Sequence, residues 1–392
     1  MTASSLRFSP TPLRRSVVLA TAALLLAGLP ACSMLGLGGS NAPEPQALPA
    51  NPAQVGAISA WRTNVGALGE TTGAQVQQGQ LLISNAAGEV LALNAKGEIL
   101  SRNAFNQPLL TAPGFDGTRV AAVTQNSELM VLAAGKVLWR QRLPAQSYTA
   151  PVVAGGRVFV LLADRSIMAF DGDTGGKLWQ VLRSTSGQAQ EALSLRQAGV
   201  LLPVGDTLVA GVGHFLQGLN PDNGRPVWSK AVANPRSTND VERLSDLVAP
   251  AYRDGSTVCA RSYQVGLACV NTQNTELLWG KPNQGQTGLG GNAQAVFSSD
   301  SDGRVRAWSR ERGLPLWVNE QFLLRHLSNP TAIGSHVALG DAQGRMYFLQ
   351  AADGSLQEYQ NTDGSAVQST LVFGGQLISL NHSGSVQAWR LP

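Results

Sequence analysis

The sequence predicts an all-β protein folded as an eight-bladed β-propeller, in which each blade is a four-stranded antiparallel sheet. Three observations lead to this prediction. A turn motif recurs eight times with an average spacing of about 42 residues, close to the period of propeller blades. A tryptophan follows four of these turns at a fixed distance of eight residues, and a fifth turn at a shorter distance. No segment between the turns has the length and the capping residues of a helix.

The clearest copy of the motif is the stretch 166–179. A short β-favouring run, 167–170, ends in the turn signal Asp-Gly-Asp-Thr-Gly. We expect the carboxylate of Asp171 to accept hydrogen bonds from turn amides and Gly175 to adopt a positive φ. Trp179 then follows on the returning strand, where a lone hairpin could not bury it. A neighbouring unit must cover this side chain.

The eight copies share a residue at which the turn begins. These residues are Asn94, Ala133, Asp171, Asn220, Asn271, Ser309, Gln350 and Arg390. A tryptophan lies eight residues later in four copies, namely Trp179, Trp228, Trp279 and Trp317, and Trp139 serves the second copy, whose turn is shorter. Ser101 and Glu358 occupy the position in the first and seventh copies, so we expect those two blades to dock less tightly.

A second hairpin precedes each motif, as in residues 150–160, and comparable segments are 248–259, 329–339 and 369–379. Two hairpins supply the four strands of a blade. The last copy lacks its outer strand, and residues 57–62 match that strand, with Trp61 in the docking position. We therefore expect the ring to close by pairing of the N-terminal strand with the C-terminal blade.

The first 31 residues contain three arginines and no acidic residue, and an apolar run occupies 17–29. The run is short for a membrane span and ends in small residues, which indicates a secretory signal. Without these arginines the 29 basic residues fall to 26, against 25 acidic ones. That balance excludes the basic surface of a nucleic-acid-binding protein.

The end of this run, Leu-Pro-Ala followed by Cys32, resembles the bacterial lipobox, in which the cysteine is lipidated and becomes residue one after cleavage. Ser33 follows where an inner-membrane retention signal would place aspartate, so the resemblance implies the outer membrane. The alternative is an ordinary signal peptide with an incidental cysteine. We expect a lipoprotein signal peptide over 1–31, a flexible tether over 32–56 and the propeller over 57–392.

The turn and tryptophan spacing resembles that of pyrroloquinoline-quinone-type eight-bladed propellers. With the lipobox, the whole chain resembles the BamB family, the lipoproteins of the outer-membrane β-barrel assembly machinery. This resemblance implies a non-enzymatic scaffold in the outer membrane, facing the periplasm. Its implied partners are the periplasmic domains of BamA, the other subunits of the assembly complex and unfolded outer-membrane proteins.

Two segments resemble family motifs that contact BamA. They are Leu-Ser-Leu-Arg at 193–196 and Glu-Arg-Leu-Ser-Asp at 242–246. By resemblance the contact residues are Leu193, Leu195, Arg196 and Asp246. The family often has a second aspartate two residues after the last of these, where this chain has Val248.

The spacing of the repeats indicates the same region independently. Two intervals, of 49 and 51 residues, exceed the others by about ten, and the excess falls in 181–198 and 231–249. We expect these loops to project from one face. The alternative for Leu193 and Leu195 is that they begin an inner strand and pack inward. The alternative for Arg196 and Asp246 is a surface ion pair within the protein.

Cys259 and Cys269 flank a hairpin symmetrically about Gln264, so they could form a cross-strand disulfide in an oxidising compartment. The alternative is two free, half-buried thiols. His214, His326, His336 and His382 lie in separate blades, without the spacing of metal ligands. Asp300 and Asp302 only faintly match a calcium loop, and we expect a solvated turn there.

We therefore predict no catalytic residue, metal or cofactor. The alternatives are a quinoprotein-like oxidoreductase or ligand-binding propeller in the periplasm, since a fold does not fix a function, and a lipoprotein scaffold for another envelope complex.

Overall fold

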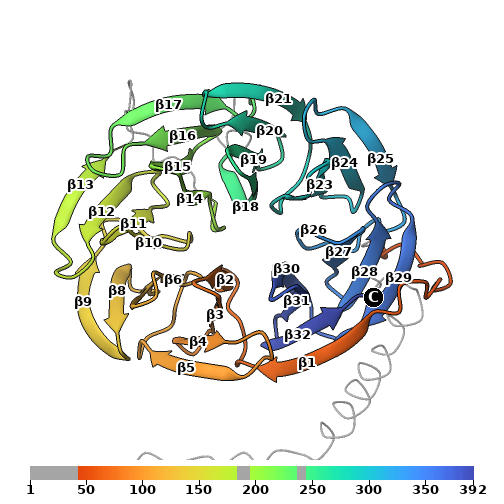
Figure 1. Ribbon diagram of the computed structural model, residues 1–392, viewed down its shortest axis with the longest axis horizontal. Helices are drawn as coiled ribbons and strands as arrows, with labels where there is room; N and C mark the ends of the chain where they lie inside the picture. Colours follow the sequence, from red (N-terminus) through yellow and green to blue (C-terminus); the bar gives the residue numbers. More distant parts are fainter. Residues whose placement is uncertain (1–42, 183–194, 236–243) are drawn as a thin grey trace, which may run out of the picture. The chain divides into compact units, whose positions relative to one another are not determined.

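The computed structural model describes residues 43–182, 195–235 and 244–392. Residues 45–392 form one compact unit. Its described part contains 32 β-strands and no helix, and the strands form eight four-stranded antiparallel sheets. Figure 1 shows the sheets arranged radially around a central axis, with the fourth strand of each at the rim. The predicted all-β, eight-bladed propeller is confirmed.

Each blade is numbered in chain order and its strands are given from the axis outwards. Blade 1 consists of β2 Ala74–Gln77, β3 Gln80–Ser84, β4 Glu89–Leu93 and β5 Ile99–Ala104, and blade 2 of β6 Gly114–Phe115, β7 Arg119–Val123, β8 Glu128–Ala133 and β9 Lys136–Arg142. Blade 3 consists of β10 Val152–Ala154, β11 Arg157–Leu161, β12 Ile167–Asp171 and β13 Lys177–Val181, and blade 4 of β14 Leu201–Val204, β15 Thr207–Val212, β16 Phe215–Leu219 and β17 Pro226–Ala231. Blade 5 consists of β18 Leu247–Asp254, β19 Thr257–Ser262, β20 Gly266–Asn271 and β21 Glu276–Pro282, and blade 6 of β22 Gly290–Gly291, β23 Ala295–Ser299, β24 Val305–Ser309 and β25 Pro315–Asn319. Blade 7 consists of β26 Thr331–Ile333, β27 His336–Gly340, β28 Arg345–Gln350 and β29 Leu356–Asn361, and blade 8 of β30 Val367–Phe373, β31 Gln376–Asn381, β32 Ser385–Arg390 and β1 Ile58–Asn64.

Blade 8 closes the ring in the predicted way. Its outer strand β1 comes from the N-terminal side of the chain and pairs antiparallel with β32, so that Thr63 lies opposite Val386. Figure 1 shows β1 beside the last blade at the rim. Pairing across more than 300 residues removes the open ends that a linear array of blades would expose.

The middle strands of the blades are apolar on both faces. In β11 and β12 nearly every residue is buried, because each face packs against a neighbouring blade. The outer strands are different: in β5 only one residue is buried. This pattern explains why the inner strands appear in the sequence as continuous apolar runs, whereas the outer strands are recognised by their tryptophans.

The turn between β12 and β13 has the predicted chemistry. The Oδ1 atom of Asp171 accepts hydrogen bonds from the amides of Asp173 and Thr174, at 3.1 and 2.8 Å. Gly175 adopts a φ of 71°. The turn leaves a backbone surface without a side chain, and this surface is where the preceding blade docks.

A tryptophan from one blade lies on the turn glycine of the next in five of the eight joints. A Cβ built on that glycine would lie only 2.3–2.6 Å from the ring. The indole N–H donates to a turn carbonyl at 2.7–3.0 Å. The tryptophan and glycine pairs are Trp61 and Gly97, Trp139 and Gly175, Trp179 and Gly224, Trp279 and Gly313, and Trp317 and Gly354. The contact combines apolar burial with a satisfied indole donor.

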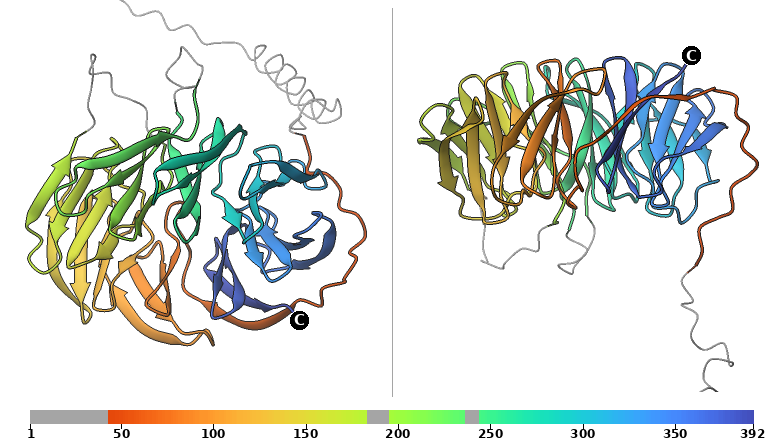
Figure 2. Two further views of the ribbon diagram at one scale, coloured as in Figure 1. Left: turned by 45° about the horizontal axis from the view of Figure 1, so that its top comes forward. Right: turned by 90° about the horizontal axis from the view of Figure 1, so that it is seen from below.

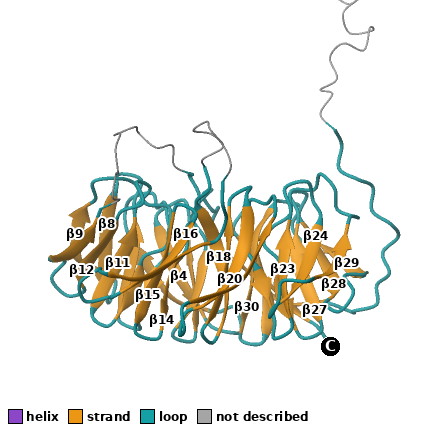
Figure 3. Ribbon diagram, turned by 90° about the horizontal axis from the view of Figure 1, so that it is seen from above, coloured by secondary structure: helices purple, strands orange, loops and turns teal. Residues whose placement is uncertain are grey.

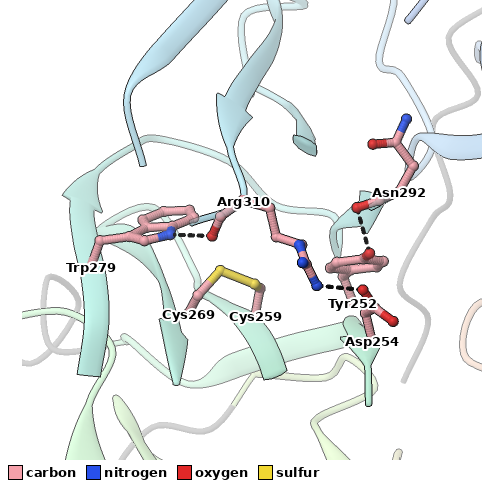
Figure 4. The surroundings of a disulfide bond; sticks show 7 residues. All are labelled: Tyr252, Asp254, Cys259, Cys269, Trp279, Asn292 and Arg310. Carbon is pink, nitrogen blue, oxygen red and sulfur yellow. Dashed lines mark hydrogen bonds and ion pairs between the residues drawn. A yellow bond between two sulfur atoms is a disulfide. The ribbon is translucent and has the colours of Figure 1, made fainter. Parts of the chain in front are cut away.

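Figure 4 shows such a joint between blades 5 and 6. The indole of Trp279 donates to the main-chain carbonyl of Arg310 at 2.7 Å. The guanidinium of the same arginine extends back to blade 5 and pairs with Asp254. Nearer the axis, the Tyr252 hydroxyl donates to the carbonyl of Asn292 at 2.6 Å. Three polar contacts therefore fasten the two blades from the rim inwards.

The joint between blades 4 and 5 lacks the contact between a tryptophan and the turn glycine of the next blade. The turn of blade 5 has Thr275, with a φ of 58°, where the other turns have glycine. Trp228 is buried, but its indole N–H has no hydrogen-bond partner. The ring lies instead over Gly218 of its own blade, where a Cβ would be 2.1 Å from Nε1. A side chain on the turn excludes the indole, and a glycine opposite the tryptophan accommodates it.

Blade 7 has Glu358 in the tryptophan position, and this joint is not the loose one we expected. The residue is 2% exposed. Its Oε2 atom accepts hydrogen bonds from the amides of Val55, Gly56 and Ala57, at 3.1, 2.6 and 3.4 Å. Blade 8 has no turn here, because its third and fourth strands come from opposite ends of the chain. A carboxylate binding the amides that lead into β1 replaces the indole binding a turn carbonyl.

The segment that precedes β1 also contacts the propeller. Although we predicted a flexible tether over 32–56, residues from 45 onwards belong to the compact unit and run along the outside of blade 7 (Figure 2). The Gln46 carbonyl accepts a hydrogen bond of 2.5 Å from the buried Arg325. The amide of Gln54 donates to Gln357 on the open edge of β29, at 3.0 Å. This segment therefore covers an edge that would otherwise be unpaired.

We expect Gly175→Ala to lower the free energy of unfolding by about 2–4 kcal/mol, because the new methyl group would clash with Trp139 and the backbone would keep its positive φ. The control is Gly135→Ala, whose φ is 74° and whose Cβ would meet nothing within 4 Å. It should cost only about 1 kcal/mol. Urea denaturation of both variants measures the difference, and equal losses would contradict the proposed role of the indole contact.

We expect Glu358→Gln to weaken ring closure by about 2 kcal/mol, since a neutral amide is a poorer acceptor for three backbone N–H groups. Hydrogen exchange at residues 55–57 should accelerate, while exchange at residues 97 and 175 in other joints stays unchanged. Wild-type protection at 55–57 would show that the carboxylate does not hold this joint.

Candidate partner-binding face

One face of the ring carries the connections between successive blades and the turns between their second and third strands. Strands β13 and β17 end on this face and β14 and β18 begin there. Figure 3 views the ring from the side, with its two faces at the top and the bottom. The two long intervals predicted from the repeat spacing fall in these connections, and residues 183–194 and 236–243 within them lie outside the described residues. Leu193 lies outside the described residues, as does Cys32.

Asp246 belongs to the described part of this face. It lies just before β18 and accepts a bidentate ion pair from Arg165, with its Oδ1 2.6 Å from Nε and its Oδ2 3.0 Å from Nη2. The two side chains are 18% and 15% exposed. Fork geometry and partial burial make this pair stronger than an ordinary surface ion pair. It ties the β11–β12 turn of blade 3 to the start of blade 5.

Sequence reasoning missed Arg165. It lies 81 residues before its partner, in a turn with a φ of 70°. No local pattern marks that turn as part of a site. The internal ion pair that we considered for Asp246 is present, and its cation is Arg165. Arg196 is exposed and makes no ion pair within the described ranges.

His214, in the β15–β16 turn, lies beside this ion pair. Burial lowers the pKa of its imidazole, the positive charge of Arg165 lowers it further, and the negative charge of Asp246 opposes both effects. Its ring lies against Phe215, with centroids 4.2 Å apart. The face therefore combines turns from blades 3 and 4 with the start of blade 5.

Leu195 is half-buried and lines a cavity of about 40 Å³ with Arg165 and Asp246. The inner strand β14 begins only at Leu201, so Leu195 precedes the strand. Beyond it, the Gln197 amide donates to the carbonyl of Gln286 at 2.6 Å and links this segment to the connection before blade 6. The structure thus brings Leu195 and Asp246 together and places Arg196 at the exposed edge of the same segment.

Val248, where the family often has a second aspartate, is 1% exposed and belongs to the inner strand β18. Its side chain packs in the cavity wall with Leu247. This position therefore offers no surface contact in the described structure.

The two cysteines lie directly opposite each other in β19 and β20 and form a disulfide. Figure 4 shows it beneath the joint between blades 5 and 6. Both residues are fully buried. The two cysteines pack with Trp279 and Val296 in the core between blades 5 and 6.

The predicted turn at residues 300–303 is present, but our expectation that it is solvated was wrong for Asp300. This side chain is 8% exposed and pairs with Arg306 at 2.6 Å. It also accepts a hydrogen bond of 2.7 Å from Asn283 and lies 3.8 Å from the fully buried Arg261. Burial lowers the pKa of Arg261 to about 10. The carboxylate oxygens therefore serve internal contacts.

The described ranges contain no group of three or more His, Cys, Asp or Glu side chains that could hold a metal ion. They also contain no helix long and apolar enough to cross a membrane.

The family described as "Outer membrane protein assembly factor BamB" matches residues 58–134 and 86–319, which is more than half of the chain. This chain belongs to the BamB family. BamB of Burkholderia pseudomallei is 31% identical over 281 residues, covering 71% of this chain and 72% of that protein. BamB of Bordetella pertussis is 29% identical over 264 residues, 67% of each chain. The predicted family resemblance is confirmed.

Solved structures give the same fold. The crystal structure of BamB from Moraxella catarrhalis aligns with a TM-score of 0.75 and 23% identity, covering 85% of this chain and 99% of that one. The quinohemoprotein alcohol dehydrogenase of Comamonas testosteroni aligns with a TM-score of 0.64 and 14% identity, over 88% and 79% of the two chains. Both alignments show that this BamB-family chain has the propeller fold, and at these identities they concern the fold alone.

The charges around His214 predict opposite effects of two substitutions. Arg165→Gln should raise the imidazole pKa, because a nearby positive charge is lost. Asp246→Asn should lower it, because the opposing negative charge is lost. An NMR titration of the histidine ring protons, assigned with His214→Gln, measures both. Shifts of the same sign would show that this ion pair does not set the local field.

Proposed function

We propose that this chain is a non-enzymatic scaffold of the outer-membrane β-barrel assembly complex, which binds the periplasmic domains of BamA and assists the delivery and insertion of outer-membrane proteins. Membership of the BamB family is the observation that carries this proposal, because the relatives are named outer membrane protein assembly factors. The lipid on Cys32 would anchor the protein to the outer membrane, facing the periplasm.

The proposed BamA contact is the face around Asp246. Leu195 is partly exposed and lines the cavity beside the Arg165–Asp246 pair. Arg196, the next residue, is exposed and makes no ion pair among the described residues. An exposed arginine beside an apolar side chain is a common composition for the centre of a protein interface. The ion pair supports this surface by fixing the start of blade 5 against blade 3. Leu193 belongs to the same proposed contact by its place in the motif.

Docking on a rigid ring suits a scaffold. The blades are fastened by repeated buried contacts, so the turns and connections of blades 3 to 5 keep their relative positions when a partner binds. Client segments could add as strands to open outer edges of the blades, a mode of recognition that depends on main-chain hydrogen bonds. The edge of β29 is already covered by residues 45–56, so the outer strands of other blades are the candidates.

The test is recovery of BamA with the lipidated full-length protein from detergent-solubilised membranes. Leu195→Glu together with Arg196→Ala should reduce the BamA recovered by about tenfold or more, because a partly exposed apolar side chain of the proposed contact becomes charged and an exposed cation is lost. The matched control is Leu314→Glu with Arg312→Ala, an exposed Leu and Arg pair in the β24–β25 turn.

This control should recover BamA as the wild type does. Failure of the wild type to recover BamA would refute the assignment of the partner. Full recovery with the Leu195 and Arg196 variant would refute the assignment of the face.

A further inference from the structure

Two of the eight joints lack a tryptophan on the outer strand. They differ in the residue that lies opposite the tryptophan position on the neighbouring strand. In blade 7 the residue opposite Glu358 is Phe348, which is fully buried. In blade 1 the residue opposite Ser101 is Ala92. Small residues also lie opposite most of the docking tryptophans, as Ala307 does for Trp317. Blade 1 therefore keeps the space for an indole and has none of its own.

A cavity of about 340 Å³ occupies this position between blades 1 and 2. Its apolar wall consists of Leu82 and Ala92 from blade 1 and Phe115 and Val120 from blade 2. Ser101 lies at its exposed outer side. A volume of this size matches small-molecule or single-side-chain sites rather than a packing defect.

The turn of blade 2 is also altered. Strands β8 and β9 are joined by the two-residue turn Ala134-Gly135, which is shorter than the other docking turns. Gly135 has a φ of 74°, and a Cβ built on it would meet nothing within 4 Å. The five turn glycines of the regular joints are each covered by an indole. Here both the indole and the part of the turn that would receive it are missing.

The third observation is a polar side chain that has lost its usual partner. In three regular joints the residue two positions after the tryptophan donates to the carbonyl of the turn glycine. These donors are Thr63, Gln141 and Asn319, at 2.6, 2.9 and 2.8 Å. The equivalent residue in blade 1 is Asn103, which lines the cavity and is 9% exposed. Its side-chain amide makes no hydrogen bond with any residue that the structure describes. The residue lines the open cavity and its amide is not closed off from solvent, so it can hydrogen-bond a ligand in the cavity.

We propose that the space between blades 1 and 2 binds a tryptophan side chain presented by another polypeptide. The ring would lie over Ala92 between the two blades, as the protein's own tryptophans do in the regular joints. A main-chain carbonyl of the bound segment would accept the hydrogen bond that Asn103 leaves unused. The occupant would thus complete the joint that the chain itself leaves open.

The site does not depend on the BamA contact, which lies at blades 3 to 5. Its assignment to clients rests on the proposed function: strands of outer-membrane barrels carry girdles of aromatic side chains, so unfolded segments of such proteins would present this ligand.

The test uses the full-length protein and the acetylated, amidated pentapeptide Gly-Ser-Trp-Ser-Gly with a 5-fluorotryptophan, observed by fluorine NMR. We expect saturable line broadening, reversed by the unlabelled tryptophan peptide and not by its alanine counterpart. Ser101→Trp should weaken binding by about tenfold or more, because it fills the site from within. Asn103→Ala should weaken it by about fivefold through loss of one hydrogen bond.

Leu178→Trp is the matched control, since it adds a tryptophan at an exposed outer-strand position of blade 3. It should bind the peptide as the wild type does. Ser101→Trp should also raise the thermal midpoint, which reports filling of the cavity without any ligand. Equal competition by the alanine peptide would overturn the proposal, as would wild-type affinity in both the Ser101 and Asn103 variants. Neither result would bear on recovery of BamA.

Discussion

The ring depends on one repeated contact, in which an indole from the outer strand of one blade lies on the turn glycine of the next. Glycine is required at this turn position for two reasons. Its φ is positive, and a Cβ would overlap the indole ring. The indole N–H then has a turn carbonyl within reach, so a large apolar group is buried without leaving a donor unsatisfied. Each blade thereby fixes the angle of its neighbour.

The departures from this contact follow from single residues. Thr275 on a turn displaces Trp228 onto Gly218, and the indole loses its hydrogen bond. Glu358 marks the place where the ring closes, because the segment leading into β1 offers amides in place of a turn carbonyl. Ser101 leaves its joint open. The same position in the repeat thus serves closure in one blade and offers a cavity in another.

The candidate partner-binding face is separate from these joints. It is built from turns and connections of blades 3, 4 and 5, and its central ion pair joins residues 81 positions apart. The rigid blades determine where these segments lie, while their side chains are available to a partner. The quinohemoprotein alcohol dehydrogenase aligns with this chain at a TM-score of 0.64 and 14% identity, which shows a shared propeller fold, and a fold does not fix the chemistry of its loops.

The sequence by itself determined the number of blades, the docking turn and the closing strand. These features depend on contacts within one repeat or between successive repeats, so Asp171, Gly175 and Trp61 can be recognised from local spacing. The segments proposed to contact BamA were recognised only by resemblance. Tertiary structure alone decided that Asp246 pairs with Arg165, that Glu358 binds residues 55–57, and that Asn103 lacks a partner. The first two depend on which residues the closed ring brings together from distant parts of the chain, and a periodic pattern contains no information about such pairs. The third depends on the shortened turn of the neighbouring blade, whose effect appears only when the two blades pack together.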